Sequence, residues 1–260
     1  MENKDNIENE PNQEKQLNLK EDDELDNQNN VSDYNNEEDI RKNRKIEVIQ
    51  EINVKTDLSF KIIIIGDSSV GKSSLANQAV KKKFDFSYHT TLGFEYLSFF
   101  VKIDNKIIKL QIWDTCGQEI YQSLIANFYR NSSLAIMVYG INNRTSFEHI
   151  DHWLKEIKRS SNPDAKIILI GNKVDLEDER VVSYEEAKKY AEDLEFSNFF
   201  ETSAKSGFNI QEVFIEAANL LYDDYIEYKS QSKGNSTISF GEKLKINEDK
   251  DEGQAKSFCC

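Results

Sequence analysis

The sequence is poor in cysteine, in proline and in long apolar runs. Among its 260 residues there are 3 cysteines, at positions 116, 259 and 260, and 2 prolines. A single internal cysteine cannot form a disulfide within a domain, which excludes a small disulfide-stabilised fold. We therefore expect a reducing, intracellular compartment. No apolar run approaches the about 20 residues that a membrane helix needs. The first five residues also lack the apolar core of a signal peptide, so none is expected.

Positive charge is also scarce. The chain has 33 Lys+Arg against 47 Asp+Glu, a net charge of −14, which excludes a nucleic-acid-binding surface as its main role because phosphate backbones attract cations. Residues 1–58 hold 8 basic and 17 acidic side chains and 12 asparagines. Because apolar residues are too sparse there to offset the entropy of ordering, we expect a disordered acidic N-terminal extension. The alternative is a short amphipathic helix through Ile46, Ile49 and Ile52 that docks on a partner.

The hydrophobic pattern of the sequence changes at residue 60, where short aliphatic runs begin to alternate with helical patterns. The runs cover 60–65, 107–113, 134–139, 167–170 and 199–202, and the helical patterns cover 75–82, 146–159, 184–194 and 210–225. This alternation predicts a parallel sheet with helices on both faces. Asp104 and Asn105 form the expected hairpin turn between 94–103 and 106–113, so one edge strand should be antiparallel. We expect a six-stranded, mostly parallel α/β domain at 59–228 and a flexible tail at 229–260.

Residues 66–73, GDSSVGKS, match the phosphate-binding pattern G-x-x-x-x-G-K-[ST] between an aliphatic strand and a helix. Glycines let successive amides converge on a β-phosphate, and the helix N-terminus adds its positive end. Lys72 supplies a compact cation to the β- and γ-phosphates, and Ser73 offers a hydroxyl to Mg²⁺. The motif alone leaves kinases, ATPases and GTPases open, and an ordinary strand-to-helix turn is the alternative. The predicted nucleotide contacts in this P-loop are Ser69, Val70, Gly71, Lys72, Ser73 and Ser74.

Two further motifs, NKVD at 172–175 and ETSAK at 201–205, each follow a predicted strand. Here the sequence resembles the Ras-like small GTPases, whose fold is that of the P-loop NTPases. The Asp175 carboxylate can accept hydrogen bonds from N1–H and the exocyclic amine of guanine, a donor pair that adenine lacks. The turn-forming preference of Asn and Asp is the alternative explanation. The resemblance implies that Asn172 orders the two loops, that Lys173 lies along the base, that the Ala204 amide meets guanine O6, and that Ser203 and Lys205 complete the pocket.

The motif WDTCGQE at 113–119 closes another predicted strand. An acid at a strand end opposite a P-loop can hold Mg²⁺ through a water, the role assigned to Asp114. Gly117 can bring its amide to the γ-phosphate, and Gln118 can orient the attacking water. Catalysis would then consist of positioning and charge stabilisation by Gln118 and Lys72, with a slow intrinsic rate.

Phe84, Tyr88 and Thr91 have the spacing of the family's first switch, F-x-x-x-Y-x-x-T, and the motif at 113–119 belongs to the second switch. The resemblance implies that Phe84 packs on the guanine edge, that Tyr88 covers the phosphates, and that Thr91 ligates Mg²⁺ when triphosphate is bound. Plain packing is the alternative for the two aromatic residues. Loss of the γ-phosphate would release Thr91 and Gly117 and let both loops relax.

Three segments, 91–96 (TLGFEY), 109–119 and 128–130 (FYR), resemble the Rab branch of the family. Departures from its pattern are Cys116, which replaces alanine, Gly140, which replaces aspartate, and Asn131-Ser132, which replaces a Gly-Ala pair. A redox-sensing role for Cys116 is the alternative to simple packing.

The chain ends in Cys259-Cys260, which fits no C-a-a-X box but is similar to the double geranylgeranylation signal of Rabs. Metal-binding or incidental thiols are the alternatives. Residues 229–260 hold 6 basic and 5 acidic side chains, so electrostatic attraction to a membrane would be weak and lipid would dominate.

The resemblance implies a GTP-hydrolysing, membrane-anchored switch in intracellular vesicle trafficking and protein transport. Its expected ligands are GTP or GDP with Mg²⁺. Its expected partners are an exchange factor, an activating protein, effectors at the switches, a prenyl-binding escort and a GDP-dissociation inhibitor. It would cycle between cytosol and the cytoplasmic face of an endomembrane. The alternative is a catalytically weak, nucleotide-bound interaction module of the same fold.

Overall fold

A computed structural model describes residues 41, 43–50, 54–86, 94–115, 129–161 and 165–232. The chain forms two compact units, Met1–Lys45 and Ile46–Cys260. Of the first unit, only Arg41 and residues 43–45 are described. The fold and the site described below belong to the second unit.

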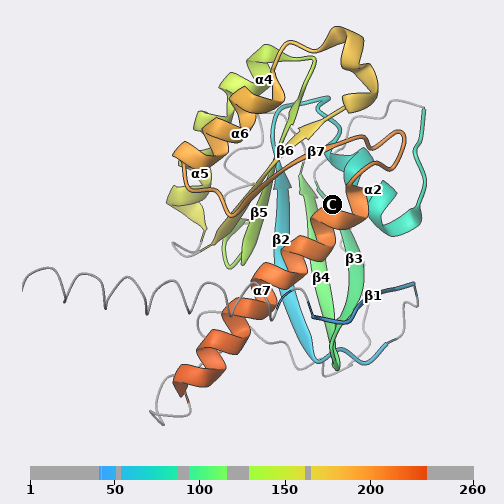
Figure 1. Ribbon diagram of the computed structural model, residues 1–260, viewed down its shortest axis with the longest axis vertical. Helices are drawn as coiled ribbons and strands as arrows, with labels where there is room; N and C mark the ends of the chain where they lie inside the picture. The colour runs from blue at the N-terminus through green and yellow to red at the C-terminus, as the bar shows by residue number, and fades with distance from the viewer. Residues whose placement is uncertain are drawn as a thin grey trace, which may run out of the picture. The chain divides into compact units, whose positions relative to one another are not determined.

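The second unit is built on a seven-stranded sheet in the order β1-β3-β4-β2-β5-β6-β7 (Figure 1). Strand β2 lies at its centre and pairs in parallel with β4 and β5, and the parallel pairing continues through β6 to β7. Strand β3 is antiparallel to both of its neighbours, β1 and β4. The strands are β1 (Ile46–Ile49), β2 (Leu58–Ile65), β3 (Phe94–Ile103), β4 (Lys106–Thr115), β5 (Leu134–Gly140), β6 (Lys166–Asn172) and β7 (Asn198–Thr202).

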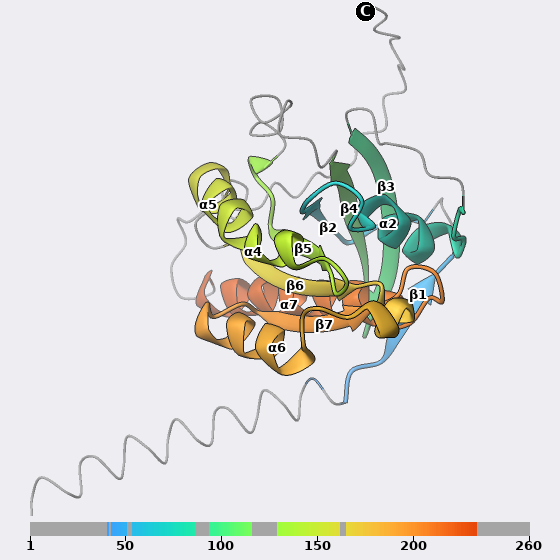
Figure 2. The same ribbon diagram turned by 90° about the horizontal axis from the view of Figure 1, so that it is seen from above.

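Helices cover both faces of this sheet, as Figures 1 and 2 show. Side chains alternate across a strand, so Ile62 and Ile64 of β2 pack with one helical layer, and Ile63 and Ile65 pack with the other. The first layer holds α2 (Lys72–Lys81) and α7 (Ile210–Ser232). The second holds α4 (Arg144–Glu148), α5 (Ile150–Ser160) and α6 (Tyr184–Asp193), and the 3₁₀ helix η3 (Val174–Glu179) follows β6.

The prediction of a mostly parallel α/β sheet with helices on both faces is confirmed, but the strand count of six is too low by one. The additional strand, β1, lies in the segment expected to be disordered, and the alternative of a helix through Ile46 and Ile49 is also wrong. Its four residues pair with residues 100–103 of β3, and Val48 packs against the core. Antiparallel β3 is therefore second from the edge. The pairing joins residues more than 50 positions apart, which local composition does not reveal.

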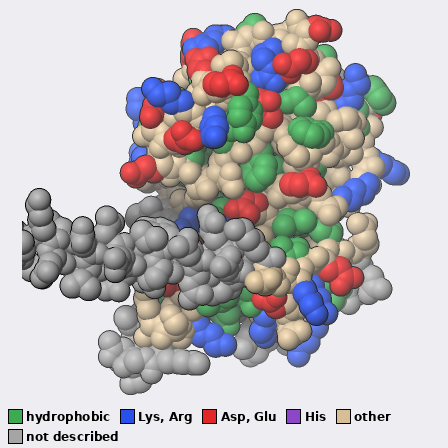
Figure 3. Space-filling view, viewed as in Figure 1, with side chains coloured by type: hydrophobic (Ala, Val, Ile, Leu, Met, Phe, Trp, Pro, Cys, Tyr) green, Lys and Arg blue, Asp and Glu red, His purple; other side chains and the backbone are tan. Residues whose placement is uncertain are grey.

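Two helix boundaries also differ from the predicted ones. The pattern at 146–159 forms two helices, α4 and α5, separated by His149. Helix α7 continues to Ser232, past the expected domain boundary at residue 228. No helix within the described ranges is long and apolar enough to cross a membrane. Figure 3 shows acidic and basic side chains mixed on the described surface of one face.

Candidate nucleotide-binding site

The predicted motifs meet at one edge of the sheet. Strands β4, β2, β5, β6 and β7 are neighbours that run in parallel, so their carboxyl ends lie at the same edge. Ligands of open α/β sheets bind outside these carboxyl ends. Asp114 near the end of β4, the P-loop after β2, and the motifs at the ends of β6 and β7 all belong to this edge.

The backbone of the P-loop requires glycine at two positions. Gly66 has a φ of 139°, and a Cβ there would lie 2.1 Å from the carbonyl oxygen of Val138. Gly71 has a φ of 100°, and a Cβ there would lie 2.3 Å from Nδ2 of Asn172. Both the left-handed backbone and the close approach exclude other residues. The two fixed glycines of the motif are thus explained by packing against β5 and β6.

Lys72, the first residue of α2, is buried, with 5% of its surface exposed. Its Nζ donates hydrogen bonds to the main-chain oxygens of Gly66, at 2.8 Å, and Asp67, at 2.6 Å. The first turn of α2 contains no acidic residue, so nothing within that turn neutralises the positive end of the helix. The ammonium and the helix terminus together form an anion-binding position at this loop.

Ser73 and Asp114 form the oxygen-rich side of the site. The Ser73 Oγ donates to Oδ2 of Asp114 at 2.5 Å. Asp114 is fully buried, and its Oδ1 has no hydrogen-bond partner within the described part of the chain. Burial raises the pKa of Asp114 to about 6, although the Ser73 hydrogen bond and the charge of Lys72 act to lower that pKa.

This donor set fits a magnesium ion. Mg²⁺ prefers carboxylate and hydroxyl oxygens and takes its remaining ligands from phosphates and water. A dication beside Asp114 would stabilise the ionised carboxylate and offset its burial. Within the described ranges, no group of three or more His, Cys, Asp or Glu side chains could by itself hold a metal ion.

Asn172, at the end of β6, joins the P-loop to the loop after β7. Its Nδ2 donates to the Val70 carbonyl at 2.8 Å. Its Oδ1 accepts hydrogen bonds from the Thr202 hydroxyl, at 3.1 Å, and from the Ala204 amide, at 3.2 Å. Only 1% of Asn172 is exposed. The side chain therefore fixes the distance between the phosphate loop and the expected base pocket.

The structure brings Asp175 together with two residues of the ETSAK motif. The Ser203 hydroxyl donates to Oδ1 of Asp175 at 2.6 Å, and Lys205 Nζ lies 3.8 Å from Oδ2. Lys173 adopts the left-handed conformation, with a φ of 74°. An ionised carboxylate has about four acceptor sites, so Asp175 keeps capacity for a pair of ligand donors.

Of the remaining predicted residues, the structure describes Phe84 and Gly140 but not the others. Phe84 is partly buried and packs on the core and on Phe86, with ring centroids 5.1 Å apart. Gly140 lies beside the pocket, because a Cβ there would be 3.9 Å from Cδ of Lys173. The predictions for Tyr88, Thr91, Cys116, Gly117, Gln118, Cys259 and Cys260 fall outside the described residues.

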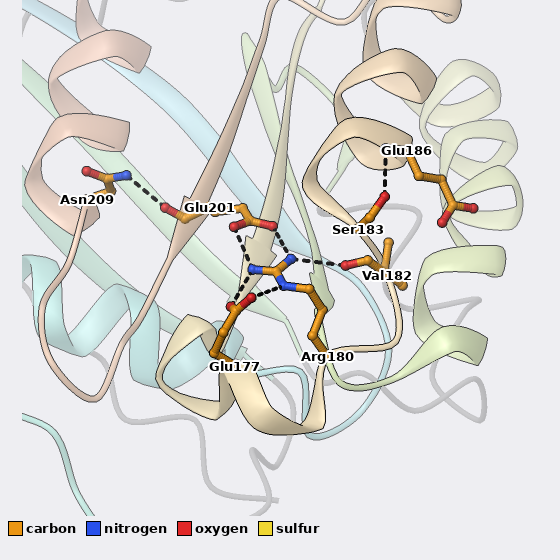
Figure 4. Close-up of polar contacts among 7 residues, drawn as sticks. All are labelled: Glu177, Arg180, Val182, Ser183, Glu186, Glu201 and Asn209. Atoms are coloured by element: carbon orange, nitrogen blue, oxygen red, sulfur yellow. Dashed lines mark hydrogen bonds and ion pairs between the residues drawn. The ribbon is translucent and has the colours of Figure 1, made fainter.

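Arg180 is a site residue that the motifs did not reveal (Figure 4). Its Nε and Nη2 each donate to the Glu177 carboxylate at 2.7 Å, and its Nη1 and Nη2 donate to the Glu201 carboxylate at 2.5 and 2.9 Å. These carboxylates raise the pKa of Arg180. Glu201 begins the ETSAK motif, and its carbonyl accepts a hydrogen bond from Asn209. Arg180 thus clamps the segment after Asp175 to the end of β7.

The family comparisons agree with this geometry. Residues 61–223 match the model of the Ras family. The chain is 37% identical to Ras-related protein RABA1b of Arabidopsis thaliana over 78% of this chain and 94% of that protein. It is 38% identical to Ras-related protein Rab11A of Lotus japonicus, over 81% and 95%, and 41% identical to Ras-related protein Rab-1 of Theileria parva, over 73% and 86%.

A P-loop beside an N-K-x-D and a Ser-Ala-Lys loop defines a guanine-nucleotide-binding protein. The chain belongs to the Ras family. Within it, the chain is a Rab-type small GTPase, an enzyme that hydrolyses GTP and acts in vesicle trafficking.

Arg180→Ala should lower the free energy of unfolding by about 2–4 kcal/mol, because it leaves the Glu201 carboxylate unpaired with only 13% of that side chain exposed. Urea unfolding measures the loss. The control is Lys189→Ala, whose pair with Asp193 joins side chains that are 76% and 65% exposed, so the loss there should stay below about 1 kcal/mol. Equal losses in the two variants would contradict the clamp.

Proposed function

We propose that this protein is a magnesium-dependent GTP switch attached to an endomembrane by lipid on its two C-terminal cysteines. The observation that carries the nucleotide assignment is the Asn172 side chain, which joins the P-loop to the loop that would recognise guanine. The site thereby offers an anion-binding loop and an acceptor carboxylate in one rigid arrangement. A phosphate site and a base site held together in this way suit a nucleoside di- or triphosphate.

Ser73 and Asp114 would hold Mg²⁺, with Thr91 as a further ligand in the triphosphate state. When bound, the ion neutralises charge on the β- and γ-phosphates. Lys72 binds the same phosphates from the side of Gly66 and Asp67, where its ammonium is already held.

The chain's own residues contribute positioning to the hydrolysis step. The Gly117 amide would contact the γ-phosphate, and Gln118 would orient the water that attacks it. The segment 113–119 contains no arginine, so an activating protein is expected to supply the cation that accelerates the reaction. Catalysis without that protein would be slow.

Loss of the γ-phosphate would free Thr91 and Gly117 and change the surface that partners contact. Effectors would bind the triphosphate form at these switches, an exchange factor would reload the protein, and an escort and a GDP-dissociation inhibitor would carry its lipid. Two lipid chains are sufficient for stable anchoring, whereas one chain gives marginal binding. The protein would cycle between cytosol and the cytoplasmic face of one organelle.

Asp175→Asn tests the recognition of guanine. The asparagine amide donates where the carboxylate accepted, so it should favour the C2 oxygen of xanthine over the amine of guanine. We expect GDP affinity to fall roughly 100-fold or more and xanthosine diphosphate to bind in its place. Competition binding measures both. The control is Asp178→Asn, an exposed position of the same 3₁₀ helix, and a mutant at Asp175 that still selects GDP would refute the assignment.

Gln118→Leu tests the hydrolytic role. The apolar side chain cannot orient water, so phosphate release in single-turnover assays should slow by roughly tenfold or more, while GDP affinity stays unchanged. An unchanged rate of phosphate release, both alone and with cell extract, would remove Gln118 from the mechanism.

Replacing both Cys259 and Cys260 by serine tests the anchor. Without lipid the protein should move from the membrane fraction to the cytosol, since the tail carries little net positive charge. Cell fractionation measures the shift, and Cys116→Ser, which retains both terminal thiols, is the control. Retention of the double variant on membranes would indicate a different anchor.

A further inference from the structure

The side chain of Asp67, the second residue of the P-loop, is held from outside the loop by α5 and by the N-cap residue of that helix, His149. The indole Nε1 of Trp153 donates to Oδ1 of Asp67 at 2.8 Å. The Nδ1 of His149 lies 2.7 Å from Oδ2 and donates to it when it carries the proton. Both carboxylate oxygens are therefore engaged by α5 and its N-cap residue, and none of these contacts is implied by the P-loop pattern.

The main chain of the same residue holds the phosphate-binding lysine. The Asp67 carbonyl accepts a hydrogen bond from Lys72 Nζ at 2.6 Å. A displacement of Asp67 would consequently displace an acceptor of the Lys72 ammonium. Asp67 therefore links Trp153 and His149 to Lys72, the residue that is expected to bind phosphate.

The helix that supplies these contacts is firmly packed. Trp153 is 2% exposed, and Ile150, Leu154 and Ile157 of the same helix are buried in the same layer of the core. His149 is the N-cap residue of α5 and lies four residues before Trp153, whose amide donates to the His149 carbonyl. The two donors are thus presented to Asp67 from a fixed support.

The position of the Asp67 carboxylate matters because the P-loop is expected to bind an anion. Residues 66–73 contain no other acidic residue, and a carboxylate near bound phosphates repels them. Two donors hold this carboxylate toward α5, and only 18% of the side chain remains exposed. The arrangement keeps the acidic group of the loop paired and the loop backbone in place.

We propose that His149 and Trp153 are positioning residues of the phosphate-binding loop, which act through Asp67 to slow the release of the bound nucleotide. This inference rests on the proposed nucleotide-binding function of the site. It assigns a share in nucleotide retention to α5 and its N-cap residue, although neither His149 nor Trp153 is among the predicted nucleotide contacts.

The test is a double-mutant cycle on the full chain, read as the rate at which fluorescent methylanthraniloyl-GDP dissociates in the presence of Mg²⁺. Trp153→Phe keeps an aromatic ring in the core but removes the N–H, and should speed release roughly three- to tenfold, the net size of one ordinary hydrogen bond. His149→Ala, at a half-exposed position, should speed release about two- to threefold. In an Asp67→Ala background, both changes should alter the rate by less than about 1.5-fold.

Lys155→Gln is the matched control, because it removes a cation from an exposed position of the same helix and should leave release unchanged. A purely structural role for Trp153 would lower thermal stability and would persist in the Asp67→Ala background. Wild-type release rates in Trp153→Phe and His149→Ala, or equal effects with and without Asp67, would overturn the inference. If the wild-type protein binds no guanine nucleotide, the proposed function itself fails.

Discussion

The site depends on one buried amide. Asn172 reaches from the end of β6 to the Val70 carbonyl on one side and to the Thr202 hydroxyl and Ala204 amide on the other. Gly71 lies so close to this side chain that a Cβ would stand 2.3 Å from its Nδ2. The phosphate loop and the loop that we expect to recognise the base therefore cannot move apart without breaking buried hydrogen bonds, and buried groups left without a partner are costly.

The other contacts of the site extend this arrangement outward. Arg180 fastens the segment after Asp175 to the start of the ETSAK motif, and α5 fastens the P-loop through Asp67. The Ser73 hydroxyl orients the Asp114 carboxyl group through a hydrogen bond. Burial raises the pKa of that carboxyl group. The protein thus holds these residues in place without a ligand, and a cation bound there would provide a partner for Oδ1 of Asp114, which has none within the described residues.

The sequence was sufficient for the parts of the structure that local patterns specify. The aliphatic run of β2 and the motif at 66–73 predicted a strand, a phosphate loop and a helix, and the structure has all three. Strand β1 was missed, because its pairing with β3 is a tertiary event within an acidic segment. Arg180 and Glu201 are 21 residues apart with no fixed spacing to mark them, and Trp153 was recognisable only as a core residue of an amphipathic helix. The family resemblance supplied the roles of Lys173 and Ala204, which physical reasoning from residue types alone did not.

The central claim is that one site binds a diphosphate and recognises guanine. The most direct test is to identify the nucleotide that the purified protein carries. Protein purified in the presence of Mg²⁺ and then denatured should release one equivalent of guanosine di- or triphosphate, which ion-exchange chromatography identifies. Protein that releases none, and that stays empty after incubation with GDP and Mg²⁺, would contradict the account.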